Sequence, residues 1–234
     1  VLKQSANIPQ MRDILRSWYQ QALDTYEFTS EVIDDASMKK RAYISSLMAL
    51  ISEFGMSTHQ DVETLLKSSK MTLNLVGWKV ALEQNPEKGI IVLRDWMVQN
   101  GFYDDLLMRM KYFSLVSQIS DPSWRFYIEE ELERGYFDYT VPNLVRALIG
   151  GFTKNIALFH TPDGSGYRFL SEQIQKIDPI NPQIASRLSK PFSSYELIDD
   201  TMRSRMSDVI RELLKKNLSS GVREILEKVI VQHQ

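Results

Sequence analysis

Apolar residues recur along almost the whole chain at intervals of three or four, the spacing that places side chains on one face of an α-helix. The stretch from 44 to 51 shows this pattern, and it follows Asp34, Asp35 and Ser37, which are residue types that begin helices. No stretch alternates apolar and polar residues cleanly enough to predict an exposed strand. The pattern therefore predicts a chain that is almost entirely helical.

Turn and capping residues divide this chain into short helices. Thr58 precedes a short apolar stripe, and Asn85 can cap a helix whose first turn contains Pro86 and which ends near Gly101. Such signals predict about ten helices of roughly 10 to 18 residues, a succession typical of stacked helix pairs. We therefore expect an all-α fold, an irregular helical-repeat superhelix of the armadillo or HEAT type. No strict sequence period and no tetratricopeptide or ankyrin signature is visible.

Composition and charge narrow the possible partners. Hydrophobic residues make up 43% and charged residues 25% of the 234 positions, as in ordinary globular proteins, so we expect one helical domain over residues 1–234. A net charge of −2 offers no basic field to a nucleic acid or an anionic membrane, and we expect neither partner. No apolar run reaches the roughly 20 residues of a membrane helix. The lack of cysteine and of a signal-peptide pattern after Val1 leads us to expect a cytoplasmic protein.

Metal and cofactor chemistry have no recognisable motif in this sequence. A zinc peptidase helix places two histidines at i and i+4 with a glutamate between them, whereas His59, His160 and His233 lie far apart. We therefore expect no metal ligand and no cofactor in this chain. The Gly-Ser-Gly run at 164–166 lacks the lysine and the strand of a phosphate-binding loop, so we expect a turn in which Ser165 caps the next helix.

Two further groups of residues could suggest a ligand site, but each has a simpler structural explanation. An acidic run could hold a cation, yet consecutive helix positions point in different directions, so a solvated face is expected. Three tryptophans lie at core spacing on their helices, which favours packing over a ligand box. The residues concerned are Glu129, Glu130, Glu131 and Glu133 in the acidic run, and Trp78, Trp96 and Trp124 among the aromatics.

The segment from Thr140 to Pro191 contains three motifs in close succession. The first is Pro-Asn-x-x-Arg-x-Leu-Ile-Gly-x-Phe, the second Asn-x-x-x-Phe-His-x-x-Asp-Gly-Ser-Gly-Tyr, and the third Asn-Pro-Gln-x-Ala-Ser-Arg-Leu-x-x-Pro. This combination strongly resembles the last portion of bacterial-type aminopeptidase N, and the resemblance extends over roughly residues 30–234, with residues 1–29 forming an earlier helix of the same domain. The matching residues are Pro142, Asn143, Arg146, Leu148, Ile149, Gly150 and Phe152; Asn155, Phe159, His160 and Asp163 through Tyr167; and Asn181, Pro182, Gln183, Ala185, Ser186, Arg187, Leu188 and Pro191.

The resemblance implies a division of labour within a larger polypeptide. In that family a preceding thermolysin-like domain binds zinc through an HExxH pair and a distant glutamate, and it activates water against the scissile carbonyl. None of those residues is in this chain, so no catalytic residue and no zinc ligand can be transferred to it. The parent is expected to be a zinc-dependent aminopeptidase, and the isolated chain is expected to be inactive. Its partners would be the catalytic domain of the same polypeptide and peptide substrates.

By the same resemblance, the helix that follows Asn181 comes closest to the substrate cavity, which this domain covers so that substrate entry is gated. Gln183 lies in the first turn of that helix and shares a face with Arg187 at i+4. We expect both to be channel residues, with Gln183 hydrogen-bonding to the peptide backbone and Arg187 attracting a peptide carboxylate or an acidic neighbour. Arg146 would join them from the adjacent helix. The alternative is that both arginines brace the helix stack through buried ion pairs.

Two functions remain to be distinguished at this stage. One is a subdomain of an aminopeptidase that gates substrate entry and performs no catalysis of its own. The other is a free-standing α-solenoid that binds a protein partner on its concave surface, as irregular helical repeats commonly do. An HExxH motif upstream in the same reading frame would indicate the first, and a start codon just before Val1 would indicate the second.

Overall fold

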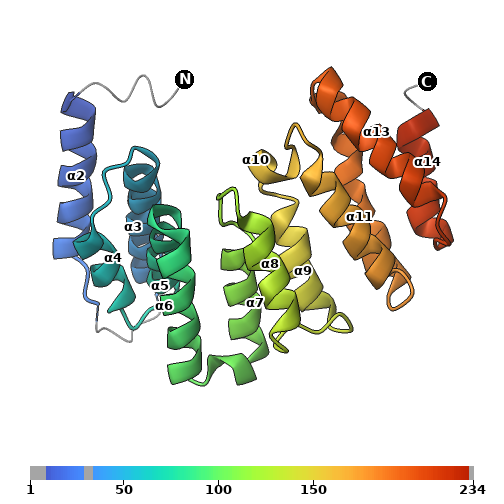
Figure 1. Ribbon diagram of the computed structural model, residues 1–234. Helices are drawn as coiled ribbons and strands as arrows, with labels where there is room; N and C mark the ends of the chain where they lie inside the picture. The colour runs from blue at the N-terminus through green and yellow to red at the C-terminus, as the bar shows by residue number, and fades with distance from the viewer. Residues whose placement is uncertain (1–8, 29–33, 232–234) are drawn as a thin grey trace. The chain divides into compact units, whose positions relative to one another are not determined.

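The computed structural model describes residues 9–28 and 34–231. Within these residues all regular secondary structure is helical, consisting of thirteen α-helices and two 3-10 helices (Figure 1). This confirms the predicted all-α fold. The packing divides the chain into two compact units, Val1–Met97 and Val98–Gln234, and each is described by itself. The expectation of one domain over residues 1–234 stays a prediction.

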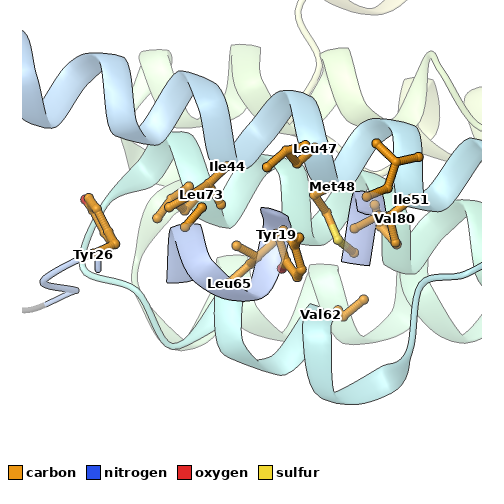
Figure 2. Packing of buried hydrophobic residues seen from close by; sticks show 12 residues of the cluster. Tyr19, Tyr26, Ile44, Leu47, Met48, Ile51, Val62, Leu65, Leu73 and Val80 are labelled. Carbon is orange, nitrogen blue, oxygen red and sulfur yellow. The ribbon is translucent and has the colours of Figure 1, made fainter. Parts of the chain in front are cut away.

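The helices of the first unit pack around one apolar core. Helix α2 packs on α3, α4 packs on α5, and α3 packs on α5. Figure 2 shows that Tyr19 of α2 lies among Leu47 and Met48 of α3 and Leu65 of α4, and all four belong to one buried cluster. The helix predicted within residues 1–29 is therefore confirmed. The helices are α2 (Pro9–Asp24), α3 (Asp35–Glu53), α4 (His59–Leu66), α5 (Met71–Gln84) and α6 (Pro86–Gln99).

The helices of this unit begin where the sequence signals place them. The side chain of Asp34 accepts a hydrogen bond from the backbone N–H of Ser37 at 2.7 Å, and the Ser37 hydroxyl accepts one from the Asp34 N–H. Thr58 caps α4 in the same reciprocal way with Asp61. The Asn85 amide oxygen accepts from the Lys88 N–H at 3.0 Å at the start of α6, as predicted.

The second unit continues the helical succession with more variable lengths. Helix α7 packs on α9, α11 packs on α12 and α13, and α12 packs on α14. The short α10 and both 3-10 helices were not predicted, because segments of three to eight residues are too short for a periodic stripe. The elements are η1 (Phe102–Asp104), α7 (Leu106–Val116), α8 (Trp124–Glu133), α9 (Pro142–Phe152), α10 (Ile156–Phe159), α11 (Ser165–Ile177), α12 (Pro182–Ser189), η2 (Lys190–Leu197), α13 (Asp200–Leu214) and α14 (Ser220–Val231).

Aromatic rings fill the core between α8, α9 and α11. Trp124 stacks on Phe152 with ring centroids 4.3 Å apart, and both rings meet the edge of Phe169. In the first unit, Trp78 is buried and lies 5.6 Å from Trp96. The tryptophans therefore pack against other rings, as their spacing predicted.

Two expectations about side chains are wrong. Glu131 was expected on a solvated face, but its exposed fraction is 0%. It follows Trp124, Tyr127 and Ile128 at helical spacing, so it shares their buried face, where Arg134 approaches its carboxylate at 3.7 Å. The burial of Glu131 was not predicted because it stands in a run of acidic residues, although it occupies a position of the buried face of α8.

The second error concerns the start of α11. Ser165 is the first residue of α11 rather than its cap. The N-cap position is Gly164, and the Oδ1 of the preceding Asp163 accepts from the Ser165 N–H at 3.0 Å and from the Ser165 hydroxyl at 2.9 Å. Gly164 between them has φ +70°, a left-handed conformation that glycine adopts without strain. The predicted turn is confirmed, and the cap position is Gly164 rather than Ser165.

A buried carboxylate joins the end of α11 to the start of α14. Asp178 accepts from the backbone N–H of Ser219 at 2.7 Å and from its hydroxyl at 2.6 Å. Both oxygens of this buried acid are thereby satisfied, as buried charges require. Among the helices of the described residues, none is long and apolar enough to cross a membrane.

Candidate functional site

Helix α12 is oriented by its cap and by one apolar face. The Asn181 side chain accepts from the Ile184 N–H at 3.1 Å, and Pro182 occupies the first turn, where its missing N–H costs nothing. Ile184, Ala185 and Leu188 are buried on the inner face. The sequence-predicted helix is therefore confirmed, and its opposite face is left for solvent.

Gln183 and Arg187 occupy that outer face. Both side chains are exposed, and their i and i+4 positions place them one turn apart. In the described part of the chain, neither side chain forms a hydrogen bond or an ion pair with another residue. The structure thus presents an amide and a guanidinium side by side, both available to an external group.

Arg146 lies on the neighbouring helix α9 and is also exposed. Its Nη1 donates to the Asn143 side-chain oxygen at 3.1 Å, a contact within one turn of helix. Helix α9 packs on α12 where Leu188 lies close to Gly150, one turn after Arg146 on the same face. Arg146 and Arg187 are both exposed, and within the described residues neither forms a buried ion pair; their role as channel residues stays a prediction.

Asn143 matches the first motif, but the sequence predicted no role for it. Its signal was present, because an asparagine three residues before an arginine on a helix can accept from the guanidinium. The contact restrains one end of the Arg146 side chain, and within the described residues its other donors make no hydrogen bond. Asn143 therefore belongs with the candidate site as the residue that orients Arg146.

Other residues of the same segment are occupied in holding the fold. His160 Nδ1 lies 2.9 Å from the Tyr167 hydroxyl, which joins α10 to α11. The Asn155 amide donates to Ser120 Oγ at 3.1 Å. A Cβ at Gly166 would lie only 2.4 Å from the Phe159 carbonyl oxygen, so this position has no room for a larger residue. These matches to the motifs therefore have structural explanations.

Burial sets the protonation of the pair that joins α10 and α11. Burial lowers the pKa of His160 below its ordinary 6.5, and it raises the pKa of Tyr167 to about 12. Hydrogen bonds from Ser165 and Thr161 hold the pKa of the Asp163 carboxyl below its ordinary value. At neutral pH the His160 imidazole and the Tyr167 phenol are therefore neutral and the Asp163 carboxyl is ionised, which suits a structural junction.

The exposed side chains of Arg146 on α9 and of Gln183 and Arg187 on α12 are groups that can bind a ligand. An amide and two guanidiniums can hydrogen-bond to peptide groups and attract carboxylates. Among the described residues no group of three or more His, Cys, Asp or Glu side chains could hold a metal ion. His59 is exposed and pairs with Glu63 at 3.1 Å, and His233 lies outside the described residues. The described residues therefore offer no set of ligands that fits a zinc ion.

Comparison with known proteins relates this arrangement to a family. Residues 5–231 match a family described as a domain of unknown function (DUF3458_C) with ARM repeats. Aminopeptidase N of Haemophilus influenzae is 29% identical over 169 residues, which are 70% of this chain and 19% of that protein. Aminopeptidase N of Escherichia coli is 36% identical over 99 residues, which are 42% of this chain and 11% of that protein. The chain thus spans a fifth or less of these relatives.

A solved structure shares the whole fold. The crystal structure of Legionella pneumophila aminopeptidase A in complex with aspartic acid superposes with a TM-score of 0.84 at 21% identity, covering 99% of this chain and 28% of that chain. The helical succession described above is therefore found within a larger protein. The chain belongs to the DUF3458_C family of ARM-repeat domains and corresponds to the C-terminal helical domain of bacterial aminopeptidase N.

Proposed function

We propose that this domain covers the active-site cavity of a zinc-dependent aminopeptidase and gates the entry of peptides to it. The observation that carries the proposal is the exposed pair Gln183 and Arg187 on α12. Neighbouring motif residues such as Asp163 and Gly166 have structural roles, whereas this pair has none within the described residues. The relatives named aminopeptidase N supply the activity of the proposed parent.

The residues of this chain would bind and orient the substrate. The Gln183 amide both donates and accepts, so it can pair with the backbone of an extended peptide. Arg187 would attract the free carboxylate of a short peptide, and Arg146, oriented by Asn143, would add a second positive charge from α9. Zinc, held by the catalytic domain of the same polypeptide, would supply the activated water. This chain contributes contacts that are similar in the ground state and the transition state.

The coding sequence upstream of Val1 provides the first test. We expect an HExxH motif in the same reading frame within a few hundred residues. A start codon directly before Val1 would instead leave a free-standing helical repeat, and the proposal would fail. Cell fractionation of the parent tests the cytoplasmic location that we also propose, with recovery in the membrane or exported fraction as the contrary result.

Kinetics of the full-length parent provide the second test. Gln183→Ala should raise KM for peptide substrates several-fold while kcat and zinc content stay unchanged, because the lost contact binds ground state and transition state alike. Gln175→Ala on α11 is the matched control, since it also removes an exposed helical glutamine from the same unit. Loss of zinc in the Gln183 variant, or equal KM changes in both variants, would contradict the assigned role.

The isolated chain provides a third test of the division of labour. Residues 1–234, once purified and checked for helical content, should bind no zinc and should not hydrolyse an aminoacyl anilide above background. Chelator-sensitive activity in this preparation would overturn the assignment of catalysis to another domain.

A further inference from the structure

One buried carboxylate lies where three helices of the second unit meet. Asp178 is the C-cap of α11, and its exposed fraction is 5%. Its Oδ2 accepts from the Ser219 N–H at 2.7 Å, and its Oδ1 accepts from the Ser219 hydroxyl at 2.6 Å. Asn181, which caps α12, follows in the same turn, where its N–H donates to the Ile177 carbonyl at 2.8 Å. The end of α11, the start of α12 and the start of α14 are therefore held around a single acid.

The place of this acid is explained by α14 rather than by α11. A negative charge is unfavourable at the C-terminus of a helix and favourable at the N-terminus, where N–H groups lack helical partners. Ser219 immediately precedes α14, and its carbonyl accepts from the Arg223 N–H at 3.0 Å, a bond with which that helix begins. Asp178 thus opposes the dipole of its own helix and fixes the beginning of another.

The first turn of α14 packs directly on α12. The Ser186 hydroxyl of α12 donates to the Gly221 carbonyl at 3.4 Å, and the two helices are packing neighbours. A Cβ at Gly221 would lie 3.3 Å from Ser186 Oγ, so glycine allows the backbone of α14 to lie close against α12. Ser186 stands directly before Arg187 and one turn after Gln183. The contact with α14 is therefore made by a residue placed between the two candidate binding residues.

We propose that Asp178 is a positioning residue for Gln183: through Ser219 it fixes the first turn of α14, and that turn sets the orientation of α12. The inference rests on the proposed function, in which Gln183 binds the backbone of a peptide. Helix α12 has only 8 residues, too few for a helix to be stable without its neighbours. Because a hydrogen bond weakens steeply when its angle departs from the preferred range, a small rotation of α12 would weaken substrate binding.

Kinetics of the full-length parent test this inference, with a peptide whose C-terminus is amidated so that Arg187 has no charge to attract. Asp178→Ala should raise KM several-fold while kcat stays unchanged. Asp178→Asn should retain most of the affinity, because its amide can accept from the Ser219 N–H and donate to the Ser219 hydroxyl. If Asp178 acts through Gln183, Asp178→Ala should raise KM no further in a Gln183→Ala background.

Controls separate positioning from a general loss of stability. Glu131→Ala removes another buried acid of the same unit and should leave KM unchanged. Equal KM increases in Glu131→Ala and Asp178→Ala would overturn the proposal, as would an undiminished effect of Asp178→Ala in the Gln183→Ala background. An Asp178→Asn variant as impaired as Asp178→Ala would also overturn it. Ser219→Ala removes the hydroxyl bond alone, so it should give a smaller KM increase, and it carries the test if Asp178→Ala does not fold.

Hydrogen exchange distinguishes failure of this inference from failure of the proposed function. In Asp178→Ala or Ser219→Ala, the amides of residues 184–189 should exchange several-fold faster than in the wild type, while those of α7 should not change. If α12 exchanges faster but Gln183→Ala leaves KM unchanged, Asp178 still positions α12 and the proposed function alone fails. If Gln183→Ala raises KM but the exchange of α12 is the same in these variants and the wild type, the positioning inference alone fails.

Discussion

At the scale of single residues, close packing and internal hydrogen bonds explain more of the motif residues than ligand binding does. Gly166→Ala should destabilise the purified protein by about 1–3 kcal/mol, because the added Cβ would meet the Phe159 carbonyl oxygen at 2.4 Å and backbone atoms must move. Gly150→Ala is the matched control, since its Cβ would meet Leu188 at an ordinary 3.7 Å, and alanine favours the helix by about 0.5–1 kcal/mol. Urea denaturation checks both, and equal effects in the two variants would contradict this explanation.

A second prediction at this scale concerns the pH dependence of stability. Because burial lowers the pKa of His160 in the folded protein, the unfolded chain binds that proton more readily. Stability should therefore fall as pH drops below about 6.5, the ordinary histidine value, toward the lower folded pKa. The slope of unfolding free energy between pH 7 and 5.5 should decrease in His160→Gln and remain in His59→Gln, whose imidazole is exposed. An unchanged slope in His160→Gln would show that another group is responsible.

Individual side-chain environments were the least predictable features. Glu131 was expected in water because acidic neighbours surround it in sequence, whereas only the packed helix shows that it shares the face of Trp124 and Ile128. Gln183 and Arg187 do lie one turn apart on α12, a relation that helical spacing alone fixes, whereas their role in a channel stays a prediction. The role of Asn143 was not predicted, although its spacing from Arg146 permits the contact that the structure shows. Local geometry was thus predictable where one helix determines it.

At the scale of elements, caps were the most predictable feature and lengths the least. Asp34, Thr58 and Asn85 all cap the helices assigned to them, because each polar side chain satisfies N–H groups that the first turn leaves open. The short η1 and η2 have no such periodic signal. The division into two compact units also left no trace in composition, since the boundary lies within the helical stretch of α6.

The cap of α12 links element stability to the candidate site. Asn181→Ala should lower the unfolding free energy by about 1 kcal/mol, the usual contribution of an asparagine cap. If the first turn of α12 positions Gln183, the same substitution should also raise KM of the full-length enzyme. Asp199→Ala, which removes the corresponding bond to the Met202 N–H at the start of α13, should cost a similar amount without changing KM. A KM increase in both variants would indicate general loosening instead.

At the scale of the whole molecule, the channel assignment predicts selectivity for peptides with a free carboxylate. In the full-length enzyme, Arg187→Gln should raise KM about fivefold for di- and tripeptides, since an exposed charge pair contributes up to about 1 kcal/mol. The same peptides with amidated C-termini should be unaffected, because the attracted charge is gone. Arg211→Gln on α13 is a matched control with a comparably exposed guanidinium. Added salt should diminish the difference between acid and amide in the wild type and leave Arg187→Gln unchanged. Equal losses for both peptide forms would show that Arg187 supports the helix stack and does not contact the substrate's terminal charge.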